Sequence, residues 1–296
     1  KKGETQENDW RSENSSHDAM SYCLDKSSPY SPEVPKLLCL LDKCLPGIVR
    51  SYVYKWSATQ CLNIKEQLDA GIRYLDLRIA HRPDDPSFNL YFVHGFYTSV
   101  TVEAILQEIL SWLQTHPKEV LILACRNLND LPPEIYIHFI QRIHKILGPN
   151  LTLRNLWSQG YQVIFSDDSI IKPLDLYLWS SIPYWWANTT SMRSLIKYLE
   201  KEKQNGRPDR FFTAGLNLTE SKLYVLLHPF GSIRKLTVPK LPFLNQWVQK
   251  QHAGPQKDSI NILAEDLIGS DSFISAVIDL NKKIFSEVCA PTTLSI

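Results

Sequence analysis

The chain has 296 residues, and its content of 44% hydrophobic and 21% charged residues is that of an ordinary globular protein. With 32 basic and 31 acidic residues the net charge is +1, which excludes an overall attraction to nucleic acid or to anionic lipid. The longest apolar runs fall far short of the ~20 residues that a membrane-spanning helix needs. The six cysteines form no C-x-x-C pair, so we expect reduced thiols in a cytoplasmic protein.

Strand-like and helix-like segments alternate along most of the chain. Residues 1–14 are polar and expected to be disordered, which leaves a domain at residues 15–296. In chain order, apolar periodicity predicts strands at 72–80 and 89–94, a helix at 102–113, a strand at 120–125, a helix at 135–147, a strand at 160–166, a helix at 191–202, strands at 211–218 and 260–267, and a closing helix at 270–285.

This alternation predicts an α/β fold in which βα units surround a parallel sheet. Six strands in one unbroken array favour a closed or nearly closed (β/α) barrel of the TIM type over a doubly wound sheet. No Gly-rich phosphate turn follows any of the strands, which argues against a Rossmann or P-loop fold. Without an internal repeat or a linker, a single domain is expected.

The strand at residues 72–80 carries charged residues on one face. Alternation places Tyr74, Asp76 and Arg78 together, with Leu75, Leu77 and Ile79 on the opposite face. Functional groups of β/α barrels lie at the C-terminal ends of the strands, which is where Asp76 and Arg78 fall. The alternative is a buried Asp–Arg pair that only closes the barrel.

Other charged residues and histidines fall at the ends of further strands. His94 ends the second strand, Arg126 follows the third, Asp266 closes the last, and His17-Asp18 lies upstream of them all. Two histidines can serve as base and acid near neutral pH, and arginine is a bidentate partner for phosphate. Together these residue types fit metal-free phosphoryl transfer.

The chain resembles the phosphatidylinositol-specific phospholipase C X-domain-containing proteins. The resemblance runs from about Ser15 to Phe285 and is carried by several motifs in the expected order: SSHDAMSYCLD (15–25), KWSATQ (55–60), QLDAGIRYLDLRIAH (67–81), FVHGFYT (92–98), HPKEVLILACRN (116–127), PYWWAN (183–188), AGLNLTE (214–220) and NILAEDLIG (261–269). It implies a distorted β/α barrel, in agreement with the alternation of strands and helices.

The resemblance also implies a role for each matching residue. His17 would be the general base on the inositol 2-hydroxyl and His94 the general acid on the diacylglycerol oxygen. Arg78 would stabilise the transition state. The remaining catalytic positions are carboxylates: Asp266 orienting His17, Asp18 supporting His94, and Asp76 holding the arginine or the attacking hydroxyl. Arg126 and Asn217 would bind the substrate.

No metal or other cofactor is expected. Calcium-dependent members of the wider superfamily carry acidic ligands where this chain has Arg78 and Arg126, and an arginine offers calcium no oxygen. The implied function is metal-independent cleavage of phosphatidylinositol-type lipids to diacylglycerol and inositol phosphate, in lipid metabolism and signal transduction. The partners would be the lipid substrate and, transiently, a membrane surface, with no nucleic acid; the oligomeric state is left open.

One departure from the family pattern concerns the start of the barrel. The residues before His17 lack apolar alternation, which predicts that the first barrel strand is missing and that His17 is poorly anchored. Two hypotheses remain for this fold. The first is an active phosphodiesterase, and the second, which a missing strand would favour, is a catalytically impaired module that binds lipid or protein. A third, a glycerophosphodiesterase, would need a carboxylate metal cluster.

The aromatic stretch from Tyr177 to Trp186 has two interpretations. Its rings either pack in the barrel rim or substrate mouth, which we favour, or they meet the lipid interface.

Overall fold

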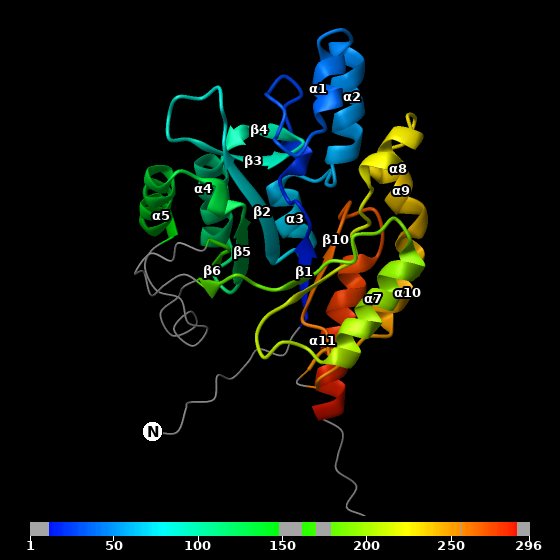
Figure 1. The fold of residues 1–296 in the computed structure, drawn as a ribbon. Helices are drawn as coiled ribbons and strands as arrows, with labels where there is room; N and C mark the ends of the chain where they lie inside the picture. The colour runs from blue at the N-terminus through cyan, green and yellow to red at the C-terminus, as the bar shows by residue number, and fades with distance from the viewer. Residues whose placement is uncertain (1–11, 148–161, 170–178, 255, 289–296) are drawn as a thin grey trace, which may run out of the picture.

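The computed structural model describes residues 12–147, 162–169, 179–254 and 256–288. Eight parallel strands form a curled sheet in the order β7-β6-β5-β2-β1-β10-β9-β8 (Figure 1). No pairing within the described residues joins β7 to β8, so the sheet is an open half-barrel, and the predicted α/β barrel-type fold is confirmed. The strands are β1 (Glu13–Ser16), β2 (Tyr74–His81), β5 (Leu121–Arg126), β6 (Val163–Asp167), β7 (Trp179–Ser180), β8 (Tyr184–Trp185), β9 (Thr213–Gly215) and β10 (Ile262–Glu265).

The first barrel strand is present, so our prediction that it is missing is wrong. All four residues of β1 pair with β10, and Ser15 and Ser16 also pair with β2. Asn14, Ser15 and Ser16 are buried although they are polar. Hydrogen bonding to two neighbouring strands satisfies the backbone, and small serine side chains fit a crowded interior without apolar residues.

The polar N-terminal segment therefore ends earlier than we predicted. Glu13 and Asn14, which we placed in that segment, belong to β1. Just before the strand, the backbone N–H of Ser12 donates to Asn281 Oδ1 at 2.6 Å, and Asn281 Nδ2 donates to the Ser12 carbonyl at 2.8 Å. This exchange ties the start of β1 to α11 (Phe273–Val288). Residues 1–11 lie outside the described residues.

The two faces of β2 separate as the alternation predicted. Leu75, Leu77 and Ile79 join the large apolar core that the helices cover. Tyr74 instead belongs to a small apolar cluster with Ile122, Ala124, Ile164 and Ile262 of neighbouring strands and Ile182 of the connection between β7 and β8. The polar positions Asp76 and Arg78 lie beyond that cluster, toward the C-terminal end of the strand.

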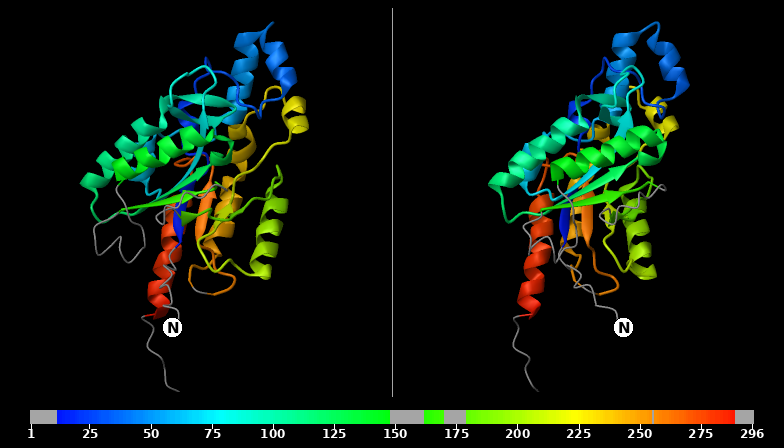
Figure 2. Two further views of the ribbon diagram at one scale, coloured as in Figure 1. Left: turned by 60° about the vertical axis from the view of Figure 1, so that its left-hand side comes forward. Right: turned by 90° about the vertical axis from the view of Figure 1, so that its left-hand side faces the viewer.

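Ten α-helices of the described residues connect or cover the strands. Figures 1 and 2 show α4 and α5 on one outer side of the curled sheet, and α7, α10 and α11 on the other. The α4 N-terminus is capped by Thr101, whose hydroxyl accepts from the Ala104 N–H, and α3 begins with a capping box of Asn63 and Glu66. The helices are α1 (Lys36–Asp42), α2 (Pro46–Ser57), α3 (Ile64–Ala70), α4 (Val102–Thr115), α5 (Pro133–Leu147), α7 (Met192–Asn205), α8 (Lys222–Leu227), α9 (Ile233–Thr237), α10 (Leu241–Gln249) and α11.

The predicted strand at 89–94 exists but does not join the parallel array. It is β3 (Leu90–His94), which pairs antiparallel with the end of β2 and with β4 (Phe96–Thr101), a strand that we did not predict. The hairpin turns at Gly95, whose φ of +70° favours glycine. The hairpin brings His94 back to the C-terminal end of the parallel strands.

Candidate active site

The register of the sheet brings His17 and Asp266 together. Ser16 of β1 is paired with Glu265 of β10, and each functional residue follows its paired strand residue directly. His17 Nδ1 lies 2.7 Å from Asp266 Oδ1. Both side chains are buried, at 8% and 0% exposure. Because a carboxylate only accepts, Nδ1–H donates to Asp266 and His17 Nε2 faces the interior of the site.

The same backbone feature follows four of the predicted site residues. The residue after each has a positive φ: Asp18 at +44°, Gly95 at +70°, Asn127 at +67° and Leu267 at +59°. Such values are uncommon in residues other than glycine and cluster at functional sites. Each turn directs the chain away just after the side chain has reached the end of its strand. The four side chains so presented are those of His17, His94, Arg126 and Asp266.

A short strap, residues 57–60, holds three of these strand ends together. The Ser57 carbonyl accepts from His94 Nδ1 at 2.7 Å, which fixes His94 Nε2 as the nitrogen that faces the site. The Thr59 carbonyl accepts from the Leu267 N–H at 2.7 Å. Gln60 Nε2 donates to the carbonyl oxygens of His17 and Glu265, and its Oε1 accepts from the Ile268 N–H. The strap therefore sets the separation of the two histidines.

Asp18 lies between the two histidines, and Arg78 contacts it. Asp18 Oδ2 is 3.5 Å from His17 Nε2 and 3.6 Å from His94 Nε2, and Asp18 Oδ1 contacts Arg78 Nε. Burial would raise the pKa of Asp18, but Arg78 and the two histidines hold it below its usual range. Asp18, Arg78 and His94 line a small hollow that is open to solvent.

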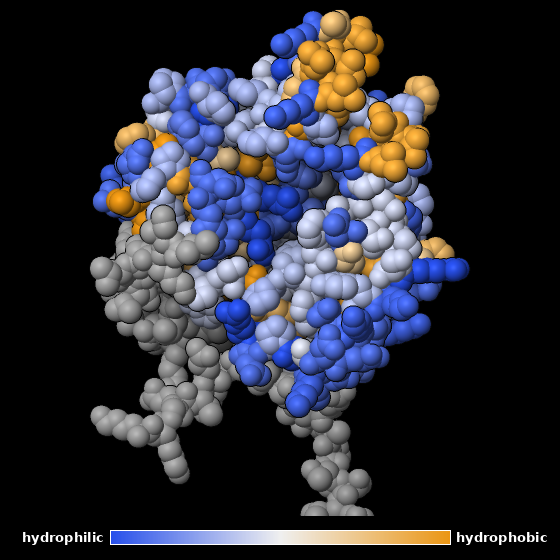
Figure 3. Space-filling model, in the orientation of Figure 1, coloured by the Kyte–Doolittle hydropathy of each residue, from blue (hydrophilic) through white to orange (hydrophobic). Residues whose placement is uncertain are grey.

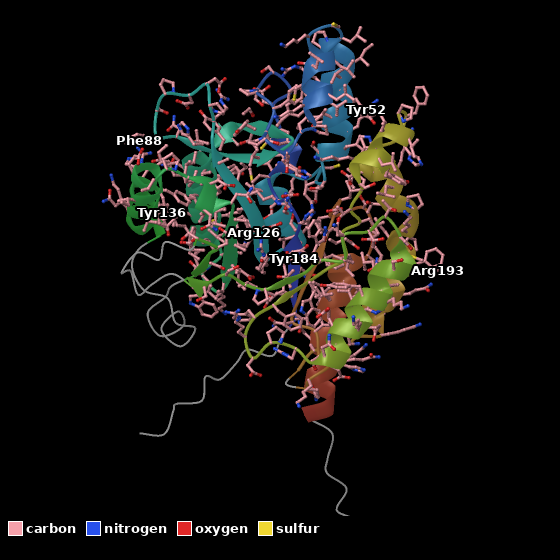
Figure 4. All side chains as sticks on the ribbon, in the orientation of Figure 1. Tyr52, Phe88, Arg126, Tyr136, Tyr184 and Arg193 are labelled. Carbon is pink, nitrogen blue, oxygen red and sulfur yellow. The ribbon has the colours of Figure 1, made fainter. Side chains whose placement is uncertain are left out.

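Arg126 is tied to Asp76 on the other side of the site. Arg126 Nε donates to Asp76 Oδ1 at 2.9 Å, and its Nη2 donates to the Tyr74 hydroxyl at 3.3 Å. The guanidinium also lies over the Tyr184 ring, 5.4 Å from its centroid, and Figure 4 shows both side chains near the middle of the molecule. The Tyr184 hydroxyl donates to Asn217 Oδ1 at 2.8 Å, and Asn217 Nδ2 is 3.5 Å from His17 Nε2.

The charge of His17 depends on two opposing influences. Burial alone would lower its pKa, but the nearby carboxylates of Asp18 and Asp266 raise it to about 9. Arg78 Nη2 lies 2.9 Å from His17 Nε2, and a guanidinium only donates, so this contact requires a neutral ring. Protonation of Nε2 would therefore displace Arg78. The site can hold either the proton or this hydrogen bond.

All eight predicted site residues thus meet in one connected cluster. The family model described as PI-PLC X 1 matches residues 52–144. The human PI-PLC X domain-containing protein 1 is 50% identical over 278 residues, which cover 91% of this chain and 86% of the relative. This chain belongs to the PI-PLC X domain-containing proteins.

One further relative and two solved structures are also similar to the chain. The human PI-PLC X domain-containing protein 3 is 33% identical over 90% of the chain and 86% of the relative. The phosphatidylinositol-specific phospholipase C of Listeria monocytogenes has a similar fold, with a TM-score of 0.58 and 17% identity over 92% of this chain and 93% of the other. A variant of the enzyme of the same name from Staphylococcus aureus gives a TM-score of 0.60 at 13% identity, covering 91% and 90%.

The match to the PI-PLC X family model covers only part of the site. Asp76, Arg78, His94 and Arg126 lie within the matched residues, whereas His17 and Asp266 lie on either side of them. The cluster is complete only when β1 and β10 close on each other. No described helix of this family member is long and apolar enough to cross a membrane.

Sequence reasoning missed several residues of the site. Four of them lie in motifs that the chain shares with its family: Ser57, Gln60, Tyr184 and Glu220. The residue types in those motifs did not indicate which contacts these residues make. Glu220 is partly buried, and its pKa is raised to about 7 by burial, against the opposing effect of His94. Glu33 has no counterpart in these motifs; its Oε1 accepts from the Gly95 N–H at 2.5 Å.

The aromatic stretch divides between the core and the site. Trp185 is buried and packs against Phe212 with ring centroids 4.3 Å apart, and Tyr184 contacts Arg126. Trp186 is exposed, and its indole N–H donates to the Thr219 hydroxyl. This distribution favours the packing interpretation for Tyr184 and Trp185. Tyr177 lies outside the described residues.

Proposed function

We propose that the protein is a phosphodiesterase that cleaves phosphatidylinositol-type phospholipids by metal-independent acid–base catalysis. One observation carries the proposal. His17 and His94 each have Nδ1 bound to a fixed acceptor, and their Nε2 atoms both face Asp18, with Arg78 beside them. Two oriented histidines next to a guanidinium are the groups that an internal phosphoryl transfer needs.

The reaction follows from these positions. His17 reacts in its neutral form, which is the form that can accept from Arg78 and whose share grows as the pH approaches its pKa of about 9. Its Nε2 takes the proton of the inositol 2-hydroxyl, and the 2-oxygen bonds to phosphorus. The bond between phosphorus and the diacylglycerol oxygen breaks, and His94 donates its Nε2 proton to that oxygen. Arg78 neutralises the charge that grows on the non-bridging oxygens. Asp266 keeps His17 in the tautomer that presents a bare Nε2.

Arg126 and Asn217 lie where they can contact the phosphate and the inositol ring. Asp76 holds Arg126 through a direct hydrogen bond, and it approaches Arg78 Nε at 3.9 Å. This step would yield diacylglycerol and inositol 1,2-cyclic phosphate, and attack of water on the cyclic phosphate would open it to an inositol phosphate. These products suit a role in lipid metabolism and signal transduction in the cytoplasm.

A binding module without activity is the second candidate function, and the reason for considering it is now weaker. We expected it because a missing first strand would leave His17 poorly anchored. β1 is present, and the His17 carbonyl and Nδ1 are both hydrogen-bonded. A glycerophosphodiesterase would need a carboxylate metal cluster, whereas Arg78 and Arg126 already engage Asp18 and Asp76.

The test is an assay of the purified protein on phosphatidylinositol vesicles. The unmodified protein should release diacylglycerol and inositol phosphate, and His17→Gln should not. His252→Gln, which changes an exposed histidine outside the cluster, is the matched control and should keep full activity. Vesicle binding by a folded protein that releases neither product would favour the binding module instead.

A further inference from the structure

The side chain of Asn217 faces the proposed base. It is buried, and its Nδ2 lies 3.5 Å from His17 Nε2. An amide has a donating end and an accepting end of nearly the same shape, so a neighbouring group has to decide which end faces the imidazole. The choice matters chemically. The NH2 group disfavours a proton on Nε2, whereas the carbonyl oxygen would accept from a protonated Nε2 and so favour that proton.

Tyr184 makes this choice through its hydroxyl. The hydroxyl lies 2.8 Å from Asn217 Oδ1, and it has no other hydrogen bond within the described residues. Its proton therefore goes to Asn217, where only the oxygen can accept it. Burial raises the pKa of Tyr184 well above its usual value, so the hydroxyl remains a donor near neutral pH. With Oδ1 held in this way, Nδ2 is the atom that is left to face His17.

A glycine of the neighbouring strand lets Tyr184 reach the amide. Tyr184 of β8 pairs with Thr213 of β9, and Gly215 follows two residues later on the same side of that strand. A Cβ atom on Gly215 would come within 2.5 Å of Asn217 Oδ1 and closer still to the Tyr184 ring. The missing side chain therefore makes room for the hydrogen bond between Tyr184 and Asn217.

We propose that Tyr184 is a positioning residue for the base, because its hydroxyl holds the Asn217 amide with Nδ2 toward His17 Nε2. The consequence for catalysis rests on the proposed function, in which His17 takes the proton of the inositol 2-hydroxyl. A hydroxyl that lies next to both groups accepts from Asn217 Nδ2 and donates its own proton to His17. In a reversed amide, Oδ1 would compete with His17 for that proton. Tyr184 thus directs the proton of the attacking hydroxyl to the base.

A substrate hydroxyl can approach this part of the site from solvent. Figure 3 shows hydrophilic surface around a hollow near the middle of this face of the molecule, and Figure 4 places Tyr184 and Arg126 in the same region. The ring and the hydroxyl of Tyr184 have separate contacts, since the Arg126 guanidinium lies 5.4 Å from the ring centroid and the hydroxyl binds Asn217. Tyr184→Phe therefore removes the orienting hydrogen bond and keeps a ring beside the arginine.

The experiment is an NMR titration of the histidine side chains in the intact protein. The chain has eight histidines, and the His17 signal is the one that His17→Gln lacks. In the unmodified protein its midpoint is expected at the pKa of about 9. Without the Tyr184 hydroxyl, Asn217 Oδ1 turns toward the imidazolium. The midpoint in Tyr184→Phe should then rise by about one pH unit, which is about tenfold tighter proton binding and the scale of one hydrogen bond to a charged group.

The substitution leaves the charged groups that face His17 in place. These groups are Asp18 beside it in the chain, Arg78 of β2, Glu220 after β9 and Asp266 after β10. The matched control is Tyr136→Phe, which removes a buried hydroxyl that donates to Asp167 and that Figure 4 places away from Tyr184. It should not move the midpoint. Gly215→Ala displaces an intact tyrosine from the amide and should raise the midpoint in the same direction as Tyr184→Phe.

A double variant shows whether Tyr184 acts through Asn217. Leucine at position 217 offers neither a donor nor an acceptor, so Tyr184→Phe added to Asn217→Leu should move the midpoint no further. An unchanged midpoint in folded Tyr184→Phe overturns the proposal, and so does the same rise in the Asn217→Leu background. The titration needs no turnover. The expected rise therefore supports the role of Tyr184 even if the protein hydrolyses no lipid, and an active protein with an unchanged midpoint overturns that role alone.

Discussion

His17 and Asp266 are 249 positions apart in the sequence, and their side chains are 2.7 Å apart in the structure. This closeness depends on the pairing of the first strand of the sheet with the last, so it exists only when the whole sheet has assembled. The strap at residues 57–60 adds a third connection, since Gln60 binds the carbonyl oxygens of His17 and Glu265 at once. The proposed base is thus held by backbone contacts on one side and a carboxylate on the other.

Replacing Asp266 with asparagine tests this orientation. An amide can accept from or donate to His17 Nδ1, so the tautomer with a bare Nε2 is no longer enforced, and loss of the carboxylate lowers the pKa of His17. We expect kcat on phosphatidylinositol to fall by roughly 10⁴-fold, the scale seen when the orienting aspartate of a Ser-His-Asp triad is replaced by asparagine.

The matched control for this prediction is Asp279→Asn, which changes an exposed aspartate paired with Lys282 on the surface of α11. It should leave kcat unchanged. Circular dichroism should show that both variants are folded. An Asp266→Asn variant with unreduced kcat would mean that His17 is not the base.

His94→Ala tests the proposed acid. The diacylglycerol alkoxide is a poor leaving group unless it is protonated, so kcat on phosphatidylinositol should fall by ~10²–10⁴-fold. In a water-soluble nitrophenyl inositol phosphate the leaving group is nitrophenolate, which needs no proton to leave. The same variant should therefore retain most of its activity on this substrate. His17→Ala should lose activity on both substrates. Equal losses on both substrates for His94→Ala would show that His94 only supports the fold.

The faces of β2 were predictable because their residues alternate. Leu75, Leu77 and Ile79 lie against the helices, and Asp76 and Arg78 lie in the site, as period-two reasoning requires. β1 gave no such signal. Three of its four residues, Asn14, Ser15 and Ser16, are buried through backbone pairing and small side chains, and apolar periodicity, the primary sequence signal of a strand, does not detect buried polar residues.

Partners in the sheet were harder to predict than the strands themselves. Residues 89–94 read as a strand, but periodicity carries no information on direction, and β3 pairs antiparallel with β4. The strap could not be predicted, because Ser57 and Thr59 act through carbonyl oxygens that every residue has. Positions at and near the strand ends supplied seven of the candidate residues of the site, and the resemblance to a family added Asn217 and a role for each residue. The sheet register explains why they meet.

The stability of the protein should depend on pH through His17. The pKa of this residue is 6.5 in an unfolded chain and about 9 in the folded protein. The folded state therefore binds the proton more tightly, and the resulting stabilisation is complete below pH 6.5 and lost as the pH rises to about 9. This change corresponds to a loss of about 3 kcal/mol in the free energy of unfolding.

Urea denaturation across this pH range measures the effect. The His17→Gln variant has no imidazole to deprotonate. Between pH 6.5 and 9 its free energy of unfolding should therefore change by about 3 kcal/mol less than that of the unmodified protein, even if the two proteins differ in stability at any one pH. Parallel curves for the two proteins would mean that the carboxylates of Asp18 and Asp266 do not hold a proton on His17.

The charges of the site predict that activity does not depend on a metal ion. One ligand atom each from His17, Asp18 and Asp76 lies within 4.8 Å of the others, which is close enough to hold an ion. However, Arg78 contacts Asp18, and Arg126 binds Asp76 at 2.9 Å, so both carboxylates are already neutralised by guanidinium groups. A divalent cation would have to displace them against charge repulsion. Activity on phosphatidylinositol should therefore survive EGTA undiminished.

Arg78→Asp completes this test. The variant loses the guanidinium that contacts the transition state and gains a carboxylate that repels phosphate, so activity in EGTA should fall by several orders of magnitude. Added calcium should restore only a fraction, because Arg126 remains beside Asp76. The matched control is Arg193→Asp, which changes an exposed arginine of α7 that Figure 4 places far from Arg126. Its activity should equal that of the unmodified protein, with or without calcium. Strong calcium dependence of the unmodified protein would contradict the metal-free mechanism, because an ion and not Arg78 would then carry the charge of the transition state.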